Sequence, residues 1–375
     1  MPDSIQSLQI GKGWLPEQGA NGLDRVFHSL CQHLPFAGVD TYEMVAGSKS
    51  VGQVSNSTYA FAPDTAPLYR RLYRARTLGQ TLCDQKEIDL VACHFALYGV
   101  SLLDMLIRTP TVIHFHGPWS AESAVEGESR VTTYLKAMVE RCVYHTGLRF
   151  IVLSHAFRDV LCNQYGVSED LVRIVPGGVD ADRFDVEASP RNARERLGWP
   201  VDRPIILSVR RLARRMGLSN LIAAMKQVSR QHPDALLLIA GKGPLRQELS
   251  ERIRSESLEE HVRLLGFVPD EDLPLAYRAA DVSIVPTIEH EGFGLITIES
   301  LAAGTPVLVT PVGGLPETVS DLSEDLVLPD ASTESLQNAL TSALNGTLPL
   351  PRPEQCHGYA RAQFNWPVIA RQVRE

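Results

Sequence analysis

The chain has 375 residues, of which 44% are hydrophobic and 21% charged, and this length is too great for one comfortable core, so we expect two domains. The formal net charge of −8 argues against the broad basic surface that nucleic-acid partners select. Six scattered cysteines without a C-x-x-C pair fit neither a disulfide framework nor a structural zinc site. Neither a secretory signal nor a membrane-spanning run is visible, which predicts a cytoplasmic protein.

Short apolar runs alternate with helical patterns throughout the first half of the chain. Strands that alternate with helices predict a parallel, doubly wound sheet. The predicted strands of this half are 5–10, 88–95, 111–116, 149–154 and 172–176.

A polar stretch without clear periodicity follows Phe184, and then a second series of apolar runs begins. The predicted strands of this half are 204–212, 235–241, 262–267, 282–286 and 306–310. Near the C-terminus, the spacing of Phe364, Val368 and Val373 predicts a helix. We therefore predict an N-terminal domain over 1–184, a linker over 185–203, a C-terminal domain over 204–356 and a helix over 357–375.

Each half is expected to be an open α/β unit that binds ligands outside the carboxyl ends of its strands. With two such units facing each other, the ligand would lie in the cleft between them. The predicted fold is therefore α/β, with two Rossmann-like domains across a cleft and a C-terminal helix that packs back on the N-terminal domain.

The segment EHEGFGLITIES, residues 289–300, places Glu291 before a glycine-rich turn and Glu299 on the helix that follows. Free backbone N–H groups and the positive end of the helix dipole suit a diphosphate at such a turn. The two carboxylates would accept hydrogen bonds from hydroxyl groups, so the pattern fits a nucleotide sugar. The alternative is that Glu291 is a solvated loop residue and Glu299 a first-turn carboxylate that complements the dipole.

This segment resembles the E-x7-E signature of family 4 glycosyltransferases, the group 1 glycosyltransferases of GT-B fold. As in that family, AGTPV (303–307) and VGGLPETV (312–319) follow it. LSVRRLARRMGL (207–218), LLIAGKGPL (237–245) and VRIVPGGVDADRF (172–184) also resemble segments of the family, so the resemblance covers nearly the whole chain.

The resemblance implies that an Arg and a Lys clamp the diphosphate, together with Gly241, Gly294 and Leu295. The Arg matches Arg211, but the Lys position falls on Met216. We expect the second cation to come from Arg215, with Arg214 and Arg210 as weaker candidates. The alternative is that these arginines form a solvated loop with weak ion pairs.

In the N-terminal half, GANGLDRV (19–26) resembles the family's glycine-rich loop, which implies that Gly22 and Asn21 approach the donor phosphate or the acceptor. His114 and His116 share one face of a predicted strand, and His116 matches the family histidine near the anomeric carbon. We expect His114 to be a core residue and His94 to be structural, and a zinc pair would need further ligands.

Other polar positions are expected to be structural. Ser154 should cap the helix that follows it. Asp180 and Asp182 superficially resemble a D-x-D metal motif but belong to the interdomain pattern. Because arginines and a helix N-terminus can neutralise a leaving diphosphate, neither a metal nor another cofactor is expected.

The resemblance implies retaining transfer of a hexose from a nucleoside-diphosphate sugar to a glycan or glycolipid, as in bacterial polysaccharide biosynthesis. Catalytic roles fall on His116 and Glu291, whereas Glu299 would hold the ribose. The alternatives are an enzyme that makes a small-molecule glycoside or a disaccharide phosphate, and a catalytically silent nucleotide-sugar-binding subunit. Residues 68–80, with arginines among Leu and Tyr, form either a solvated helix face or a peripheral contact with the inner face of the plasma membrane.

Overall fold

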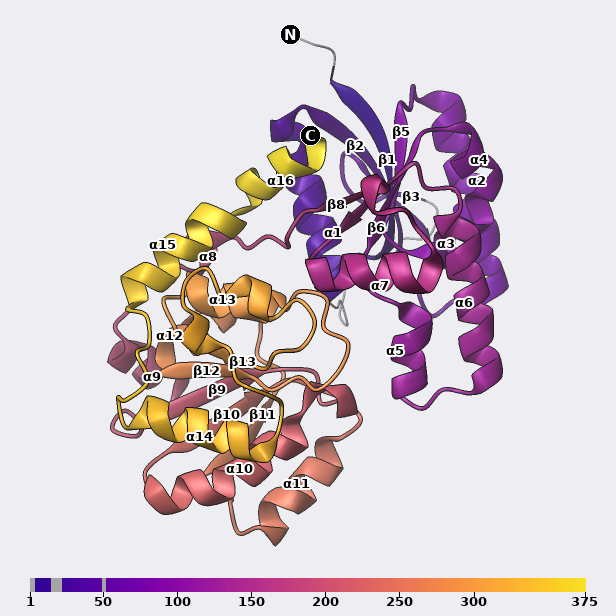
Figure 1. Cartoon of the computed structure of the whole chain (residues 1–375). Coiled ribbons are helices and arrows are strands. Elements are labelled where there is room, and N and C mark those ends of the chain that lie inside the picture. Colours follow the sequence, from indigo (N-terminus) through magenta and orange to yellow (C-terminus); the bar gives the residue numbers. More distant parts are fainter. Residues whose placement is uncertain (1–3, 15–21, 49–51) are drawn as a thin grey trace. The chain divides into compact units, whose positions relative to one another are not determined.

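The computed structural model describes residues 4–14, 22–48 and 52–375, and the chain divides into two compact units (Figure 1). The first unit is the chain up to Gly178 together with Trp366–Glu375, and the second is Val179–Asn365. The segment 185–203, predicted as a linker, therefore lies inside the second unit. Its helix packs against the helix over Leu273–Ala279, because the apolar side of the segment is buried there.

Among the described residues of the first unit, eight strands form one sheet in the order β3-β4-β2-β1-β5-β6-β7-β8. Only the β3–β4 pair is antiparallel among the recorded pairs, so the predicted parallel sheet is confirmed. Sequence patterns did not reveal β2 or the short β3 and β4. The strands are β1 Ile5–Gly13, β2 Val39–Ala46, β3 Gly52–Gln53, β4 Thr58–Ala62, β5 Leu90–Cys93, β6 Thr111–Phe115, β7 Arg149–Val152 and β8 Val172–Ile174.

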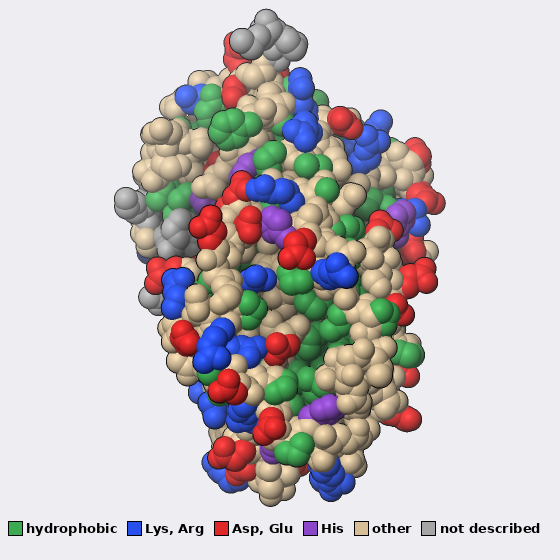
Figure 2. All heavy atoms as spheres, turned by 90° about the vertical axis from the view of Figure 1, so that its left-hand side faces the viewer, with side chains coloured by type: hydrophobic (Ala, Val, Ile, Leu, Met, Phe, Trp, Pro, Cys, Tyr) green, Lys and Arg blue, Asp and Glu red, His purple; other side chains and the backbone are tan. Residues whose placement is uncertain are grey.

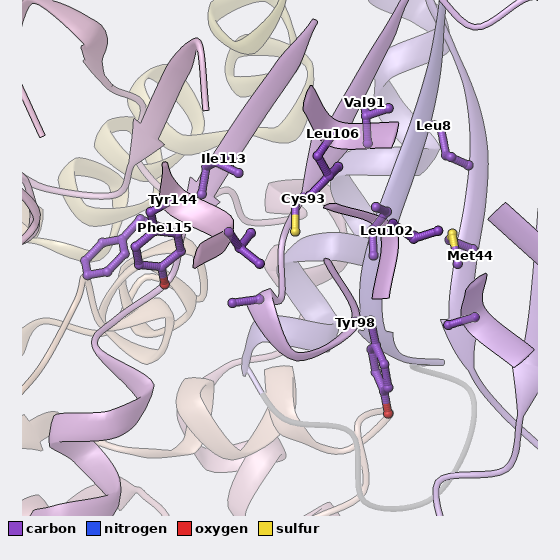
Figure 3. Close-up of a cluster of buried hydrophobic side chains, with 14 of the residues drawn as sticks. Leu8, Met44, Val91, Cys93, Tyr98, Leu102, Leu106, Ile113, Phe115 and Tyr144 are labelled. Atoms are coloured by element: carbon purple, nitrogen blue, oxygen red, sulfur yellow. The ribbon is translucent and has the colours of Figure 1, made fainter. Parts of the chain in front are cut away.

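One face of this sheet carries the large apolar core of the first unit. Leu8, Met44, Ile113 and Phe115 from the strands meet Tyr98 and other side chains from the covering helices (Figure 3). Alternation along each strand explains this, because every second residue points to the same face. The helices of the first half are α1 Gly22–His33, α2 Leu68–Gln85, α3 Ala96–Gly99, α4 Leu103–Arg108, α5 Trp119–Val125, α6 Arg130–Tyr144 and α7 His155–Tyr165.

The predicted C-terminal helix is two helices, α15 (Pro353–Phe364) in the second unit and α16 (Trp366–Arg374) in the first. The break falls at Asn365, because Pro367 lacks an amide hydrogen and cannot continue the preceding helix. α16 packs on α1 and stacks Trp366 on His33, with ring centroids 6.1 Å apart, so the predicted return of the C-terminus to the first domain is confirmed.

The second unit, all of whose residues are described, has a five-stranded parallel sheet in the order β11-β10-β9-β12-β13. Helices α10 and α14 pack together on one side of it, and α12 and α13 lie on the other (Figure 1). The strands are β9 Ile205–Val209, β10 Leu236–Ala240, β11 Val262–Gly266, β12 Val282–Val285 and β13 Val307–Val309. The remaining helices are α8 Ala181–Phe184, α9 Pro190–Leu197, α10 Leu218–Gln231, α11 Arg246–Ser255, α12 Leu273–Ala279, α13 Leu295–Ala302 and α14 Thr333–Leu344.

Candidate active site

The strand order of the second unit creates a switch point between β9 and β12. β9 pairs with β10 on one side and with β12 on the other, so the chain leaves the carboxyl ends of these neighbouring strands in opposite directions. Open α/β sheets bind ligands at such a point. Arg210 follows β9 directly and Thr287 follows β12 closely, so the loops that carry the predicted site residues begin at this point.

The turn after β12 leads into α13 through Gly294, whose φ of 84° lies in the left-handed region that favours glycine. No side chain caps the N-terminus of α13. A Cβ atom at Gly294 would lie 2.5 Å from Leu315, so the backbone here also depends on a close approach. The amide groups at Leu295 and beyond thus begin the helix without a side-chain acceptor, as the sequence predicted for an anion site.

The backbone of Glu291 is held by the glycine-rich turn that follows β13. Gly314 donates a backbone hydrogen bond of 3.0 Å to the Glu291 carbonyl. Gly313 has a φ of 59°, and a Cβ atom there would lie 1.8 Å from the same carbonyl oxygen. The VGGLPETV segment therefore positions Glu291 through its backbone, and glycine at 313 is a steric requirement.

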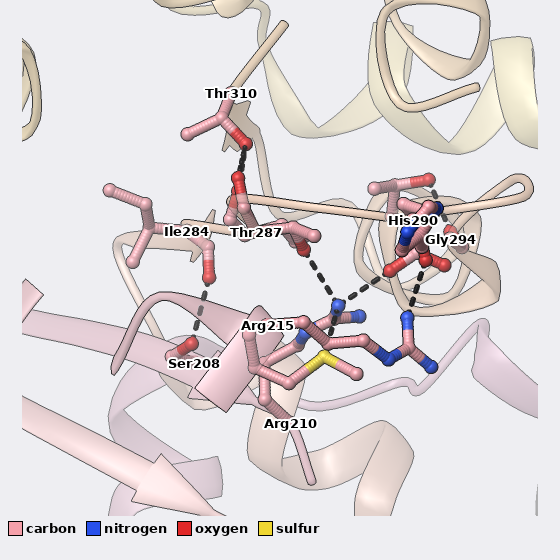
Figure 4. A network of polar contacts seen from close by, with 12 residues as sticks. Ser208, Arg210, Arg215, Ile284, Thr287, His290, Gly294 and Thr310 are labelled. Atoms are coloured by element: carbon pink, nitrogen blue, oxygen red, sulfur yellow. Dashed lines mark hydrogen bonds and ion pairs between the residues drawn. The ribbon is translucent and has the colours of Figure 1, made fainter. Parts of the chain in front are cut away.

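The Glu291 carboxylate forms an ion pair with Arg210. Arg210 Nη2 lies 2.5 Å from Glu291 Oε2 and 2.7 Å from Thr287 Oγ1, and the same nitrogen lies against Met216 Sδ (Figure 4). The Arg210 side chain is 8% exposed and that of Glu291 14%, so both charges are largely removed from water. Glu291 is thus not the solvated loop residue of the alternative interpretation.

The other arginines of this loop lie differently. Arg211 and Arg214 are exposed, whereas Arg215 is half-buried and donates from Nη1 to the carbonyl oxygen of His290 (Figure 4). Met216, which stands at the family's lysine position, is 5% exposed and packs beneath the loop. The guanidinium that contacts Glu291 therefore belongs to Arg210. From the sequence, Arg210 was considered a weaker candidate than Arg215 for the second cation at the diphosphate.

Gly241, at the end of β10, holds this loop against the sheet. Its φ is 145°, and a Cβ atom there would lie 1.9 Å from the Arg210 carbonyl oxygen. Arg210 N donates 2.8 Å to the carbonyl of Ala240, and Leu212 N donates 2.9 Å to that of Lys242. In this structure, Gly241 lets two backbones approach each other.

Glu299 lies on the second turn of α13 and is 6% exposed. It accepts a hydrogen bond of 3.2 Å from the hydroxyl group of Tyr277, which comes from α12. The first turn of α13 contains no acidic residue, so the alternative in which Glu299 is a first-turn carboxylate is wrong. No sequence pattern indicated Tyr277, because its pairing with Glu299 depends on how α12 packs against α13.

In the first unit, three histidines gather at the carboxyl ends of β5 and β6. The rings of His114 and His116 are stacked with centroids 6.2 Å apart, which confirms that they share one face of the strand. His94 Nδ1 lies 3.1 Å from His116 Nε2, and His94 Nε2 lies 3.0 Å from Gln9 Oε1. His114 and His94 are buried, as expected for core residues, whereas His116 is half-buried.

Burial keeps these imidazoles uncharged. It lowers the pKa of His114 to about 3 and that of His116 to about 4, and it lowers the pKa of His94 well below its ordinary value. Removing an imidazolium from water costs free energy, and charged neighbouring rings would add repulsion. At neutral pH each ring therefore has one N–H donor and one acceptor nitrogen.

The remaining predicted residues have simpler settings. Gly22 begins α1 and is exposed, and Asn21 lies outside the described residues. Ser154 accepts a 3.1 Å hydrogen bond from Phe157 N, which confirms its role as the cap of α7. Asp180 caps α8, and Asp182 pairs with Arg361, so the D-x-D pattern serves local structure.

Two surface observations bear on partners. Within residues 4–14, 22–48 and 52–375, no helix has the length and apolar character needed to span a bilayer. α2 is helical as predicted, and it exposes Tyr69 and Tyr73 beside Arg70 and Arg74. On the face drawn in Figure 2, acidic and basic side chains are intermixed.

Sequence comparison places both halves of the chain among glycosyltransferases. Residues 190–363 match the family described as Glycosyl transferases group 1, and residues 20–183 match Glycosyltransferase Family 4. The chain is 30% identical over 297 residues to the D-inositol 3-phosphate glycosyltransferase of Corynebacterium jeikeium, a match that covers 75% of this chain and 70% of that protein.

Two further relatives match over a smaller share. An uncharacterized glycosyltransferase of Methanocaldococcus jannaschii is 31% identical over 247 residues, 62% of this chain and 60% of that one. The GDP-mannose-dependent alpha-(1-6)-phosphatidylinositol monomannoside mannosyltransferase of Mycolicibacterium smegmatis is 32% identical over 232 residues, 59% of each chain. The chain thus spans about three fifths of these two relatives.

Solved structures share the fold. The sucrose-phosphate synthase of Thermosynechococcus elongatus superposes with a TM-score of 0.78 at 24% identity, over 99% of this chain and 97% of that one. Anabaena HepE in complex with UDP-glucose gives a TM-score of 0.77 at 19% identity, over 99% and 98%. The predicted GT-B architecture is confirmed by these superpositions.

Proposed function

Because the chain belongs to the group 1 glycosyltransferases of family 4, we propose that it transfers a hexose from a nucleoside-diphosphate sugar, with retention of configuration, to a hydroxyl of a glycan or lipid-linked acceptor. The observation that carries this proposal is the uncapped N-terminus of α13 at the switch point of the second unit, beside the buried pair of Arg210 and Glu291. This arrangement offers backbone donors to a diphosphate and a carboxylate to sugar hydroxyls.

The donor's diphosphate is proposed to lie against the amides of Gly294 and Leu295, with Arg211 and Arg215 as its cations. Charge-assisted hydrogen bonds from guanidinium groups suit phosphate oxygens. Glu299, already held by the Tyr277 hydroxyl, would accept from the ribose.

Glu291 is proposed to bind hydroxyls of the transferred sugar, and Arg210 acts as its positioning residue. Because Arg210 Nη2 lies on Glu291 Oε2, Oε1 of the carboxylate is left to accept from a sugar hydroxyl. The same ion pair gives the largely buried carboxylate a partner without using the cations that would face the diphosphate.

The proposed reaction is a front-face substitution. The bond from the anomeric carbon to the phosphate oxygen breaks, the bond to the acceptor oxygen forms on the same face, and the leaving phosphate takes the acceptor's proton. Developing negative charge on the diphosphate would be stabilised by the arginines and by α13, so no metal is required. Turnover that persists in excess chelator is the expected result, and its loss on chelation would contradict this part of the proposal.

The decisive test combines donor binding with product analysis. Thermal shift with UDP-, GDP- and ADP-sugars should identify the base, since a ligand that binds only the folded state raises Tm. Transfer to candidate acceptors, followed by mass and anomeric analysis of the product, then tests retention. A product of inverted configuration, or no stabilisation by any nucleotide sugar, would refute the proposal.

A small-molecule acceptor is the second candidate. It is favoured by the match to the D-inositol 3-phosphate glycosyltransferase, and a mannosylfructose-phosphate synthase of Agrobacterium fabrum is also 30% identical over 245 residues. Product mass separates this candidate from glycan extension. A third candidate, a silent nucleotide-sugar-binding subunit, rests on Met216 at the family's lysine position, and slow hydrolysis of the donor by the protein would exclude it.

We also propose a cytoplasmic location with peripheral contact at the inner face of the plasma membrane through α2. Arg71 donates to the Tyr98 hydroxyl and Arg76 pairs with Asp104, whereas Arg70 and Arg74 are exposed. Co-sedimentation with anionic vesicles should fall when both are changed to glutamate. Equal binding by the wild type and this variant would favour a merely solvated helix.

A further inference from the structure

A chain of buried hydrogen bonds runs from the backbone of β2 to His116 at the end of β6. Ser7 Oγ donates 2.9 Å to the carbonyl of Asp40, and Gln9 Nε2 donates 2.9 Å to Ser7 Oγ. Gln9 Oε1 and His94 Nε2 are 3.0 Å apart, and His94 Nδ1 and His116 Nε2 are 3.1 Å apart. Ser7, Gln9 and His94 are each at most 3% exposed, so water hardly competes for these bonds.

The first bond sets the direction of all the others. A carbonyl oxygen only accepts, so the Ser7 hydroxyl gives its single proton to Asp40 and must accept from Gln9. The amide NH₂ of Gln9 therefore faces Ser7, and its oxygen faces His94. An amide turned the other way would place two acceptors against each other in a buried site.

The same logic passes through the imidazoles. His94 Nε2 carries the proton, because it faces an oxygen that has none to give. In a neutral ring His94 Nδ1 is then an acceptor, so His116 Nε2 must be the donor. We infer that this chain holds the His116 ring in one tautomer, with its proton on Nε2 and its lone pair on Nδ1.

The three histidines also present one nitrogen each within 4.8 Å of one another, the number and type of ligands that a zinc ion takes. The geometry favours the tautomer relay over a metal site. The rings of His94 and His114 are stacked with centroids 3.9 Å apart and 16° between their planes. Lone pairs lie in the ring planes, so those of parallel rings run side by side and do not converge on one ion.

For the reaction, Ser7, Gln9 and His94 are positioning residues that act through His116. A neutral His116 with a free Nδ1 lone pair accepts a hydrogen bond from a donor-sugar hydroxyl and presents electron density, not charge, to a developing oxocarbenium ion. This consequence rests on the proposed function, whereas the tautomer itself does not.

The tautomer is tested directly by nitrogen NMR of the full chain labelled at histidine, with His116→Gln used to assign the signal. We expect the Nε2–H form for His94 and His116. Because the pKa values of both rings are lowered, neither ring should titrate between about pH 6 and 8. A protonated Nδ1 on His116, or titration of its ring within this range, would overturn the inference.

Variants then separate positioning from loss of structure. Gln9→Leu removes the acceptor of His94 and should give a mixture of His116 tautomers and a kcat lower by about tenfold or more. Thr111→Val removes another fully buried hydroxyl, on β6 itself but outside the chain of bonds, and should change neither the spectrum nor kcat.

The outcomes separate the two proposals. A single His116 tautomer in Gln9→Leu would overturn the relay even if the enzyme is active. A single tautomer in the wild type and a mixture in Gln9→Leu would support the relay even if no glycosyl transfer is found, in which case only the proposed function fails.

Discussion

Replacing Arg210 by methionine should destabilise the second unit by about 3–5 kcal/mol, because the change leaves the Glu291 carboxylate buried without its partner. The magnitude follows from the setting of the pair. The two side chains are 8% and 14% exposed, and the distance between their charged atoms is 2.5 Å. Thr287 Oγ1 would lose its contact with the guanidinium as well.

The measurement is chemical and thermal denaturation of the wild type, Arg210→Met, Glu291→Gln and the double variant. For a unit of this size each kcal/mol corresponds to about 2–4 °C, so the single arginine change should lower Tm by roughly 6–20 °C. The double variant removes both charges and should regain most of the lost stability, since the cost lies in an unpaired buried charge more than in the loss of the pair.

Arg214→Met is the matched control, because Arg214 is exposed in the same loop and its change should cost at most about 0.5 kcal/mol. A loss below about 1 kcal/mol in Arg210→Met, or a double variant as unstable as the sum of the two single ones, would refute the reasoning. Either result would mean that the pair is solvated or uncoupled.

Three other perturbations test separate parts of the molecule. Arg215→Ala should raise the donor KM by about 10- to 100-fold, the equivalent of one hydrogen bond to a charged group, while Arg214→Ala should leave it near the wild-type value. Because burial lowers the pKa of His114 to about 3, this residue alone should lower the free energy of unfolding by up to about 1.4 kcal/mol per pH unit as pH drops from 6.5. His94 and His116, whose pKa values are also lowered, add to the slope, so His114→Gln should reduce it by the share of one histidine, and an unchanged slope would contradict the assignment. Gly178→Ala should destabilise the first unit by about 1–3 kcal/mol, since its Cβ would lie 2.5 Å from the tryptophan ring of α16, whereas Gly358→Ala, with open space around it, should not be destabilising.

The positions of Glu291, Glu299 and His116 could be predicted because each lies in a contiguous motif at the end of an apolar run. The side chains that surround these three residues could not be predicted. The partner of Glu291 was expected to be solvent or substrate, and Arg215 was preferred to Arg210 as the second cation. Arg210 and Glu291 are 81 positions apart and meet only because β9 lies beside β12.

By itself, the sequence determined the alternation of strands and helices, the two α/β units and the location of the motifs. These features depend on local periodicity and on glycines at turns, which short segments carry on their own. Only the tertiary structure decided the Arg210–Glu291 pair and the relay from Ser7 to His116. Strand order brings these distant residues together, and side-chain hydrogen bonds act only at contact distance.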